Sequence, residues 1–225
     1  MACPYGVYIV LLHKLQNQGY DRHQYTNFKY PFPYDPPYVP VENPCGAYVR
    51  EFTADKSWNG MRKYISFEGV DSCFYLWING KFIGYSQVSH STSEFDITEC
   101  IHEGINTIAV LVLKWCDGSY FEDQDKFRTS GIFRDVYILL RPQKYIRDFF
   151  VKTALSEENK KAEISVDMDF IGGSQEVEYR LIDNCTGNVK AQGQAAENKI
   201  TSTFPSARDR SCWSLAHSGH HRYKA

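Results

Sequence analysis

The chain lacks any apolar run long enough to cross a lipid bilayer. Its N-terminal apolar run, VYIVLL at residues 7–12, is far shorter than the ~20 residues that a membrane-spanning helix needs. The first 15 residues also lack the basic start and the small-residue cleavage site of a secretory signal. These absences predict a protein that is not exported and has no membrane partner.

A basic cluster and a CxxC pair are also missing. The 25 Lys and Arg residues against 27 Asp and Glu give a formal net charge of −2, which argues against nucleic acid as a partner. The cysteines, seven in number, are spread along the chain at positions 3, 45, 73, 100, 116, 185 and 212. This spread predicts reduced thiols in a cytoplasmic protein, rather than a disulfide framework or a zinc site.

Helical periodicity is almost absent, whereas short β-branched and aromatic runs are frequent. These runs predict strands at 48–53, 63–68, 73–78, 81–85, 94–98, 106–114 and 132–140. Asn79-Gly80 separates two of them and predicts a type I′ hairpin turn, in which both central residues need positive φ. Many short strands and few helices predict an all-β fold, either a β-sandwich or a jelly roll.

Proline is concentrated in one segment, since six of the nine prolines lie within residues 25–44, YTNFKYPFPYDPPYVPVENP. Because proline fixes φ and lacks a backbone donor, this segment predicts an extended strap over a surface, held by its aromatic residues. Asn27 lies near its start. Its amide could both donate to and accept from a ligand hydroxyl, or it could serve only to form a turn.

A loop of about 16 residues joins the predicted strands 106–114 and 132–140, a length that is usually functional or disordered. It is rich in aromatic residues, too rich for a solvated linker. It also holds four acids, Asp117, Glu122, Asp123 and Asp125. Carboxylates and rings together suit a cation or a polyhydroxylated ligand, although a solvated acidic loop is the plainer interpretation.

After Arg141-Pro142 the chain changes to strands separated by charged or glycine-containing turns. Four strands are expected, at 146–153, 162–170, 176–182 and 189–194. An immunoglobulin-type sandwich needs about seven strands, so residues 143–200 predict part of one. Residues 201–225 show no usable period and predict a disordered tail, whose Cys212, His217, His220 and His221 lack metal-site spacing.

Four segments carry a resemblance to a known family. They are GYDRHQYTNFKYPFPYDPPYVPVENPCGAYVREF, FYLWINGKFIGYSQ, SEFDIT and WCDGSYFEDQDKFRTSGIFRDV. Together they resemble the N-terminal sugar-binding domain of the large bacterial β-galactosidases of glycoside hydrolase family 2. The similarity is close over about 18–142 and looser to about 200, whereas 1–17 and 201–225 diverge.

The resemblance implies a jelly roll of the galactose-binding type over 18–142 and part of an immunoglobulin-like sandwich over 143–200. It implies that Asn27 matches the family's galactose-contacting Asn. It also implies that Asp125 matches the Asp that touches galactose and helps to bind sodium. The sodium site would be incomplete here, and the family's magnesium site is expected on the catalytic barrel.

The catalytic residues of the family have no match in this sequence. Retaining hydrolysis needs two carboxyl groups about 5 to 5.5 Å apart, and in the family both are glutamates on a TIM barrel, one of them in an Asn-Glu dipeptide. No Asn-Glu occurs among the 225 residues, and a barrel takes roughly 250. We therefore expect a truncated β-galactosidase gene product with no catalytic residues, inactive alone.

The function expected is that of an N-terminal fragment of a β-galactosidase, an enzyme that hydrolyses terminal β-D-galactosides such as lactose. Its partners would be a galactoside, once a barrel completes the site, and a β-galactosidase oligomer or complementing chain. Two alternatives remain: a free-standing carbohydrate-binding module, and an interaction module that complements a separate catalytic chain.

Overall fold

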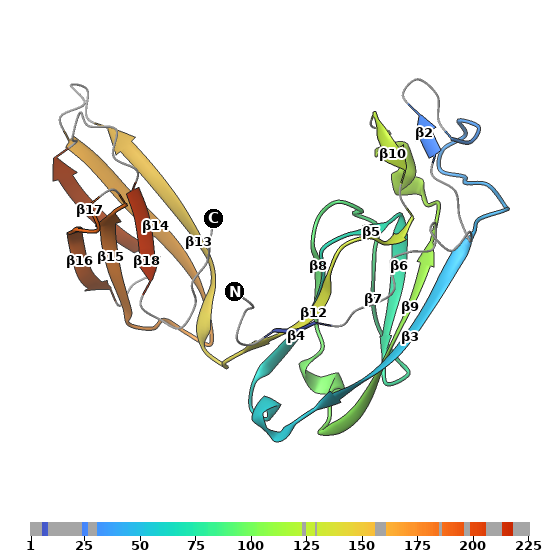
Figure 1. Cartoon of the computed structure of the whole chain (residues 1–225), viewed down its shortest axis with the longest axis horizontal. Helices are drawn as coiled ribbons and strands as arrows, with labels where there is room; N and C mark the ends of the chain where they lie inside the picture. The colour runs from blue at the N-terminus through green and yellow to red at the C-terminus, as the bar shows by residue number, and fades with distance from the viewer. Residues whose placement is uncertain are drawn as a thin grey trace. The chain divides into compact units, whose positions relative to one another are not determined.

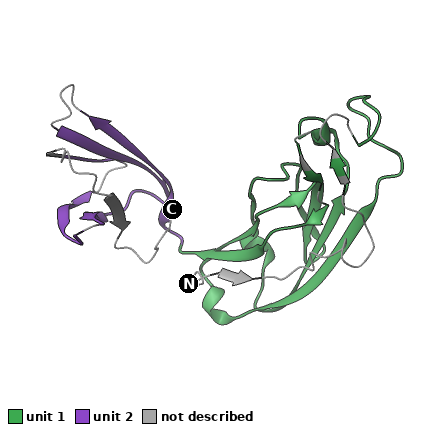
Figure 2. Cartoon of the chain, turned by 45° about the horizontal axis from the view of Figure 1, so that its top comes forward, with its two compact units in different colours: residues 1–142 green, residues 143–225 purple. Residues whose placement is uncertain are grey.

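The structure is a computed structural model that describes residues 6–8, 24–26, 31–122, 125–128, 130–155, 161–184, 186–195, 199–205 and 213–217. It divides into two compact units, unit 1 at residues 1–142 and unit 2 at residues 143–225 (Figure 2). The described residues are almost all in strands and turns, which confirms the predicted all-β class. They include no helix with the length and apolarity that a membrane crossing requires.

Unit 1 is built on two four-stranded antiparallel sheets (Figure 1). The first has the order β1-β12-β4-β8, with bounds Gly6–Tyr8, Val136–Arg141, Arg62–Phe67 and Ser93–Asp96. The second has the order β3-β9-β6-β7, with bounds Cys45–Ala54, Gly104–Leu113, Cys73–Ile78 and Lys81–Ser86. Non-consecutive neighbours in both sheets show that the chain crosses repeatedly between the layers, as in a jelly roll.

Among the described residues of unit 1 there are also two short strand pairs and three 3-10 turns. The pairs are β5 with β11, Val70–Asp71 with Gly131–Ile132, and β2 with β10, Gln24–Thr26 with Lys126–Arg128. The turns are η1 at Lys56–Trp58, η2 at Thr98–Cys100 and η3 at Asp117–Tyr120. The first four-stranded sheet begins with β1, so part of the segment expected to diverge, 1–17, belongs to unit 1.

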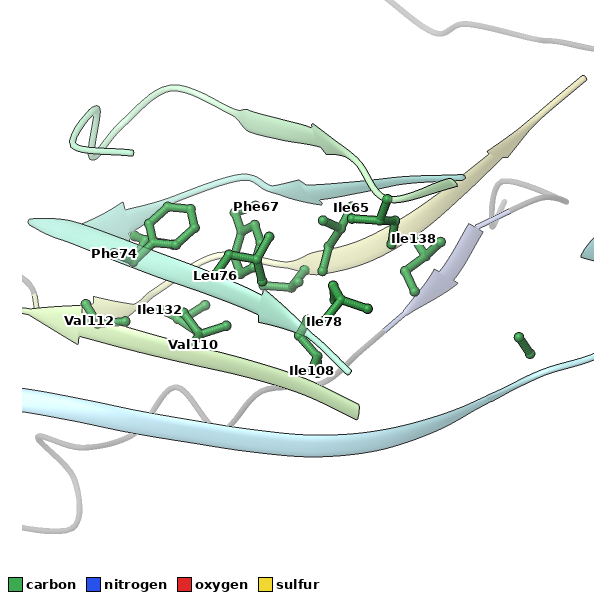
Figure 3. Close-up of a cluster of buried hydrophobic side chains, with 14 of the residues drawn as sticks. Ile65, Phe67, Phe74, Leu76, Ile78, Ile108, Val110, Val112, Ile132 and Ile138 are labelled. Carbon is green, nitrogen blue, oxygen red and sulfur yellow. The ribbon is translucent and has the colours of Figure 1, made fainter. Parts of the chain in front are cut away.

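The core of unit 1 lies between the two sheets. In β9 every second residue is buried, namely Asn106, Ile108, Val110 and Val112, which is the period-2 alternation of a strand with one covered face. These residues meet side chains from β4, β6 and β12, including Ile65, Phe67, Leu76 and Ile138, all nearly inaccessible to solvent (Figure 3). The buried apolar layer therefore holds the sandwich together.

Most strands of the two main sheets lie within two or three residues of the predicted ranges, whereas β1, β2, β5 and β10 were not predicted. The predicted hairpin forms, since Asn79 and Gly80 have φ of 51° and 78°. The expected strand 132–140 instead divides into β11 and β12. β11 pairs with β5 and β12 with β4. Between them the Phe133 ring lies over Gly69, where an added Cβ would come within 2.7 Å of the ring.

Unit 2 contains two three-stranded antiparallel sheets. One has the order β13-β14-β17, Tyr145–Leu155, Lys161–Ile171 and Lys199–Pro205. The other has the order β16-β15-β18, Val189–Ala195, Val177–Asp183 and Trp213–His217. A small core of Val166, Met168, Val177 and Ile200 is buried in the unit.

The expectation of four strands followed by a disordered tail is wrong for β17 and β18. Both lie wholly or mostly within 201–225, and their partners explain why they form: β17 pairs with β14 so that Ile200 faces Val166, and β18 covers the second edge of β15. His217 belongs to β18, whereas Cys212, His220 and His221 lie outside the described residues.

Candidate functional site

The pairing of β2 with β10 brings together the two segments that carry the predicted ligand residues. Phe127 lies opposite Tyr25 in the antiparallel register, and their ring centroids are 5.4 Å apart. The Tyr25 hydroxyl donates to Oδ1 of Asp125 at 2.5 Å, across 100 positions of sequence. Asp125, the predicted sugar and sodium contact, is therefore held by a residue of the strap segment.

Asn27, the other predicted ligand residue, lies outside the described residues. It directly follows Thr26, the last residue of β2, whose register partner is Lys126. Asn27 thus comes directly after the paired position Thr26, and Asp125 comes directly before its partner Lys126. The predicted loop acid Asp123 also lies outside the described residues.

Three exposed rings belong to the segments that meet at Asp125. Tyr25, Phe121 and Phe127 are 54%, 90% and 68% exposed, values that are uncommon for phenylalanine in a folded unit. The β2–β10 pair lies beyond the two main sheets at one end of unit 1 (Figure 1). A carboxylate that accepts hydrogen bonds beside ring faces that cover C–H groups is suited to a polyhydroxylated ligand.

Buried polar groups hold the acidic loop in place. Arg128 is buried, and its Nη1 donates to the Glu122 carbonyl at 2.9 Å. The Glu122 carboxylate in turn accepts from the Ser89 backbone N–H at 3.2 Å, and Asp117 accepts from the N–H of Gly118 at 2.9 Å. Two of the predicted acids therefore bind backbone amides of the protein.

Aromatic residues hold the proline strap, as the sequence predicts, and their partners lie on the acidic loop. Phe32 is buried against Trp115 and Tyr120, with ring centroids 5.1 and 5.2 Å apart. The Tyr120 hydroxyl donates to the Tyr38 carbonyl at 2.5 Å and accepts from the Asp35 N–H at 3.2 Å. The same hydroxyl is also 3.4 Å from the Pro33 carbonyl, so Tyr120 bonds the strap at three places, a role that the sequence alone did not assign to it.

Asn43 closes the strap onto the end of β9. Its side-chain amide donates to the Trp115 carbonyl at 2.8 Å and accepts from the Trp115 N–H at 2.9 Å. The next backbone bond runs from the Lys114 N–H to the Pro44 carbonyl at 2.9 Å. The strap and the acidic loop consequently form one framework that positions β2 and β10.

A cation site would need more oxygen ligands than the described residues supply. Sodium and similar hard cations take about six oxygens, and no group of three metal-ligating side chains occurs in the part of the chain that the structure describes. Asp125 offers one carboxylate, one oxygen of which already accepts from Tyr25. The described residues therefore do not by themselves fit a complete cation site.

Known proteins share both the sequence and the fold. Residues 4–142 match the family model of the glycosyl hydrolases family 2 sugar binding domain. The chain is 52% identical over 167 residues to a beta-galactosidase of Actinobacillus pleuropneumoniae and 53% identical over 163 residues to one of Staphylococcus xylosus. These alignments cover 74% and 72% of this chain but only 16% of each relative.

Solved structures agree with the fold. A beta-glucuronidase of an uncultured Clostridium species superposes with a TM-score of 0.62 at 22% identity, covering 79% of this chain and 33% of that one. A beta-glycosidase from Bacteroides vulgatus gives 0.62 at 20% identity, covering 86% and 28%.

The extent of the family match corrects one expectation. Similarity was expected to begin near residue 18, but the family model matches from residue 4, in accord with the pairing of β1 with β12. The match spans well over half of the 225 residues. The chain therefore belongs to glycosyl hydrolases family 2, and residues 4–142 are its sugar binding domain.

Proposed function

We propose that this chain is the sugar-contacting N-terminal part of a β-galactosidase, in which Asn27 and Asp125 bind the galactose of the substrate. The catalytic glutamates would come from a TIM barrel outside these 225 residues. One observation carries the proposal: Tyr25 of the strap hydrogen-bonds Asp125 of the acidic loop at 2.5 Å. The two motifs that the family resemblance assigns to galactose thus meet at one place.

The chemistry of the site is that of binding and orientation. The Tyr25 O–H donates to Oδ1 of Asp125, which fixes the carboxylate, and Oδ2 can then accept a hydrogen bond from a sugar hydroxyl. The exposed rings of Phe121 and Phe127 offer apolar faces to sugar C–H groups. We further propose that Asp125 contributes one sodium ligand and that the other ligands come from the barrel.

The same reasoning predicts that the chain alone hydrolyses no β-galactoside. Retaining hydrolysis needs an acid and a nucleophile on opposite sides of the scissile bond, about 5 to 5.5 Å apart. In the described loop, Glu122 and Asp117 bind backbone amides, and Asp125 binds Tyr25. We also propose a cytoplasmic location, which is supported by the thiols of Cys45, Cys73, Cys100 and Cys116, none of which forms a disulfide.

Complementation tests the proposal. The chain would be mixed with a β-galactosidase that lacks its N-terminal sugar binding domain, and hydrolysis of a chromogenic galactoside would be followed at several sodium concentrations. Restored activity should fall at least tenfold with Asp125→Asn and lose most of its sodium dependence. The matched control is Asp117→Asn, an exposed acid of the same loop that keeps the oxygen bonded to Gly118.

Tyr25→Phe tests the positioning of the carboxylate separately. Because this change removes only the hydroxyl donor, KM should rise more than kcat falls. Equal activity of the Asp125 and Asp117 variants in the restored enzyme would refute the proposed role of Asp125.

The exposed rings favour one second candidate, a free-standing carbohydrate-binding module. Calorimetry of the isolated chain with galactose separates it from the first proposal. Binding by the chain alone, weakened by Phe127→Ala, would support the module. Negligible binding alone, with recovery in the complemented enzyme, would support the shared site.

A further inference from the structure

The outer face of the second sheet, formed by β3, β9, β6 and β7, is apolar. On the inner face, Phe74, Leu76 and Ile78 of β6 are buried in the core. The intervening residues of β6 therefore point outward, and the strand registers align them with residues of β7, β9 and β3. The two rows are Tyr85, Tyr75, Leu111 and Ala47, and Phe82, Trp77, Ala109 and Val49. We call these eight residues the aromatic face, and none of them carries a charge.

Four rings make up one half of the aromatic face and contact one another. The ring centroids of Tyr75 and Tyr85 are 4.9 Å apart, and those of Trp77 and Phe82 are 5.7 Å apart. Tyr75 also lies 6.2 Å from Trp77, so the two pairs form one cluster. The exposed fractions are 52% for Phe82, 40% for Tyr85 and 71% for Val49 on β3. Large apolar side chains that point away from the core therefore remain accessible.

The outer face of the first sheet differs, although it belongs to the same unit. There the registers align Asp96 with Tyr64 and Glu94 with Ser66, and both acids are exposed. The Arg62 guanidinium lies 3.8 Å from the Asp96 carboxylate. Such polar and charged residues are usual where one face of an antiparallel sheet meets water. The aromatic face has the composition of an interface core, which is rich in Tyr, Trp and Phe and poor in charge.

Two observations indicate what covers the aromatic face. The alignments with the beta-galactosidases cover only 16% of each relative, so most of the polypeptide of those proteins lies outside the part that this chain matches. The face also adjoins the candidate site. Cys45 and Leu113 are register partners, the strap ends directly before Cys45, and the acidic loop follows Leu113. Ala47 and Leu111 of the aromatic face are two positions from this end, so a polypeptide that brings catalytic groups to Asp125 approaches the same end of the sheet.

We propose that the aromatic face is the docking surface for the polypeptide that carries the catalytic barrel of the β-galactosidase. The inference rests on the proposed function, and it names the surface through which that function is assembled. Burial of Trp77 and Tyr85 would contribute most of the affinity, because these residue types are enriched among the hot spots of protein interfaces.

The orientation of the rings favours a protein over a carbohydrate as the occupant. A sugar stacks flat on one ring face, and a chain of sugars needs several such faces in one plane. Here the interplanar angle is 58° between Trp77 and Phe82 and 49° between Tyr75 and Tyr85. Trp77 and Tyr75 are also partly covered by their neighbours. Such an uneven surface fits the side chains of another protein, which fill the spaces between the rings.

Binding measured without substrate tests the docking surface. The whole chain, labelled with a fluorophore at its N-terminus, would be titrated with the Actinobacillus pleuropneumoniae beta-galactosidase from which the N-terminal sugar binding domain has been deleted. Fluorescence anisotropy would give Kd. Phe82→Glu and Val49→Glu should each raise Kd at least tenfold, because each places a charge in the buried interface. The matched control is Phe150→Glu, at a ring of unit 2 that is 65% exposed, and it should leave Kd within twofold of the wild type.

Activity distinguishes a failure of this inference from a failure of the proposed function. With Phe82→Glu, the concentration of chain that gives half-maximal hydrolysis of a chromogenic galactoside should rise at least tenfold. With Asp125→Asn, the maximal rate should fall while Kd, measured without galactoside and sodium, stays the same. A wild-type rate for Asp125→Asn would count against the proposed function only. A wild-type Kd for both Phe82→Glu and Val49→Glu would overturn the docking surface only.

Cross-linking of the two co-expressed polypeptides locates the contact directly. With p-benzoylphenylalanine in place of Phe82, irradiation should link the chain to the truncated enzyme, whereas the same residue in place of Phe150 should give no link. Links to a second copy of this chain, or no complex in either experiment, would overturn the inference. Retention on a polysaccharide resin that Phe82→Glu abolishes, without a link to the enzyme, would assign the face to carbohydrate and would overturn it too.

Discussion

Asn106 is the most informative residue to change in unit 1, because a fully buried amide uses all its hydrogen-bonding capacity there. Its exposed fraction is 0%. Its Oδ1 accepts from the His102 N–H at 3.1 Å and from the Asn79 amide at 2.8 Å. Its Nδ2 donates to the carbonyls of His102 at 2.7 Å and Gly104 at 3.0 Å. The side chain thus ties the β6–β7 hairpin to the start of β9.

The cost of removing this amide follows from the groups left behind. Asn106→Ala deletes four hydrogen bonds, each of which contributes about 1 kcal/mol net. Water can bond to some of the backbone and side-chain groups that Asn106 leaves unpaired, so the loss of stability should be smaller than the sum of the four hydrogen bonds. We expect a decrease of about 3 kcal/mol in the free energy of unfolding. Asn106→Asp should cost at least as much, since it places a carboxylate beside two carbonyls.

Urea unfolding followed by tryptophan fluorescence measures the effect. A Trp213→Phe background removes the tryptophan of unit 2 from the signal. With a slope of about 2 kcal/mol per molar urea, the midpoint should fall by about 1.5 M. The control Asn59→Ala, at an exposed asparagine, should stay within about 0.5 kcal/mol of the wild type.

A double-mutant cycle tests the direct bond between the two asparagines. Asn79→Gly keeps the positive φ of the turn while removing the side chain. The coupling energy with Asn106→Ala should be about 1 kcal/mol. A midpoint shift below about 0.25 M for Asn106→Ala would refute the view that this network stabilises unit 1.

Three further changes test other parts of the fold. Phe32→Ala removes the buried ring of the strap and should cost about 3 kcal/mol; limited proteolysis should then cleave the strap at least tenfold faster than the rest of unit 1. Gly84→Ala places a Cβ 2.6 Å from the Phe95 ring and should lower the free energy of unfolding by about 1 to 3 kcal/mol. Thermal unfolding should show that adding Phe95→Leu to this variant recovers part of the loss. The hydrogen bond from the Lys152 side chain lowers the pKa of Asp167, so this pair stabilises unit 2 at neutral pH and stops doing so as the carboxylate is protonated in acid. Asp167→Asn should therefore flatten the decline in the melting temperature of unit 2 below pH 5. An unchanged decline would contradict this.

Local signals in the sequence were sufficient for much of unit 1. Asn79-Gly80 predicted its hairpin because the turn requires positive φ at both residues. The alternation in β9 predicted its buried face because the side-chain period of a strand is two. The proline strap was recognisable because its composition excludes a central strand.

Features set by long-range pairing were beyond the sequence alone. β17 has a weak pattern of its own and forms because Ile200 meets Val166 of β14. The acids of the loop are similar in sequence, yet Asp125 bonds Tyr25 whereas Glu122 bonds the Ser89 amide. Which acid faces a ligand depends on partners that lie up to 100 positions away, and residue type does not encode that distance.

The strand order of the first sheet has a consequence for synthesis on the ribosome. β12 lies between β1 and β4, and its first residue, Val136, pairs with Phe67, which leaves the ribosome 69 residues earlier. At about 5 to 20 residues per second, this interval lasts roughly 4 to 14 s. During that time one edge of β4 has no strand to pair with, and an open edge is a template for strands of other chains. The nascent chain is therefore most prone to aggregate just before β12 emerges, and slower translation of residues 114–135 would lengthen that period.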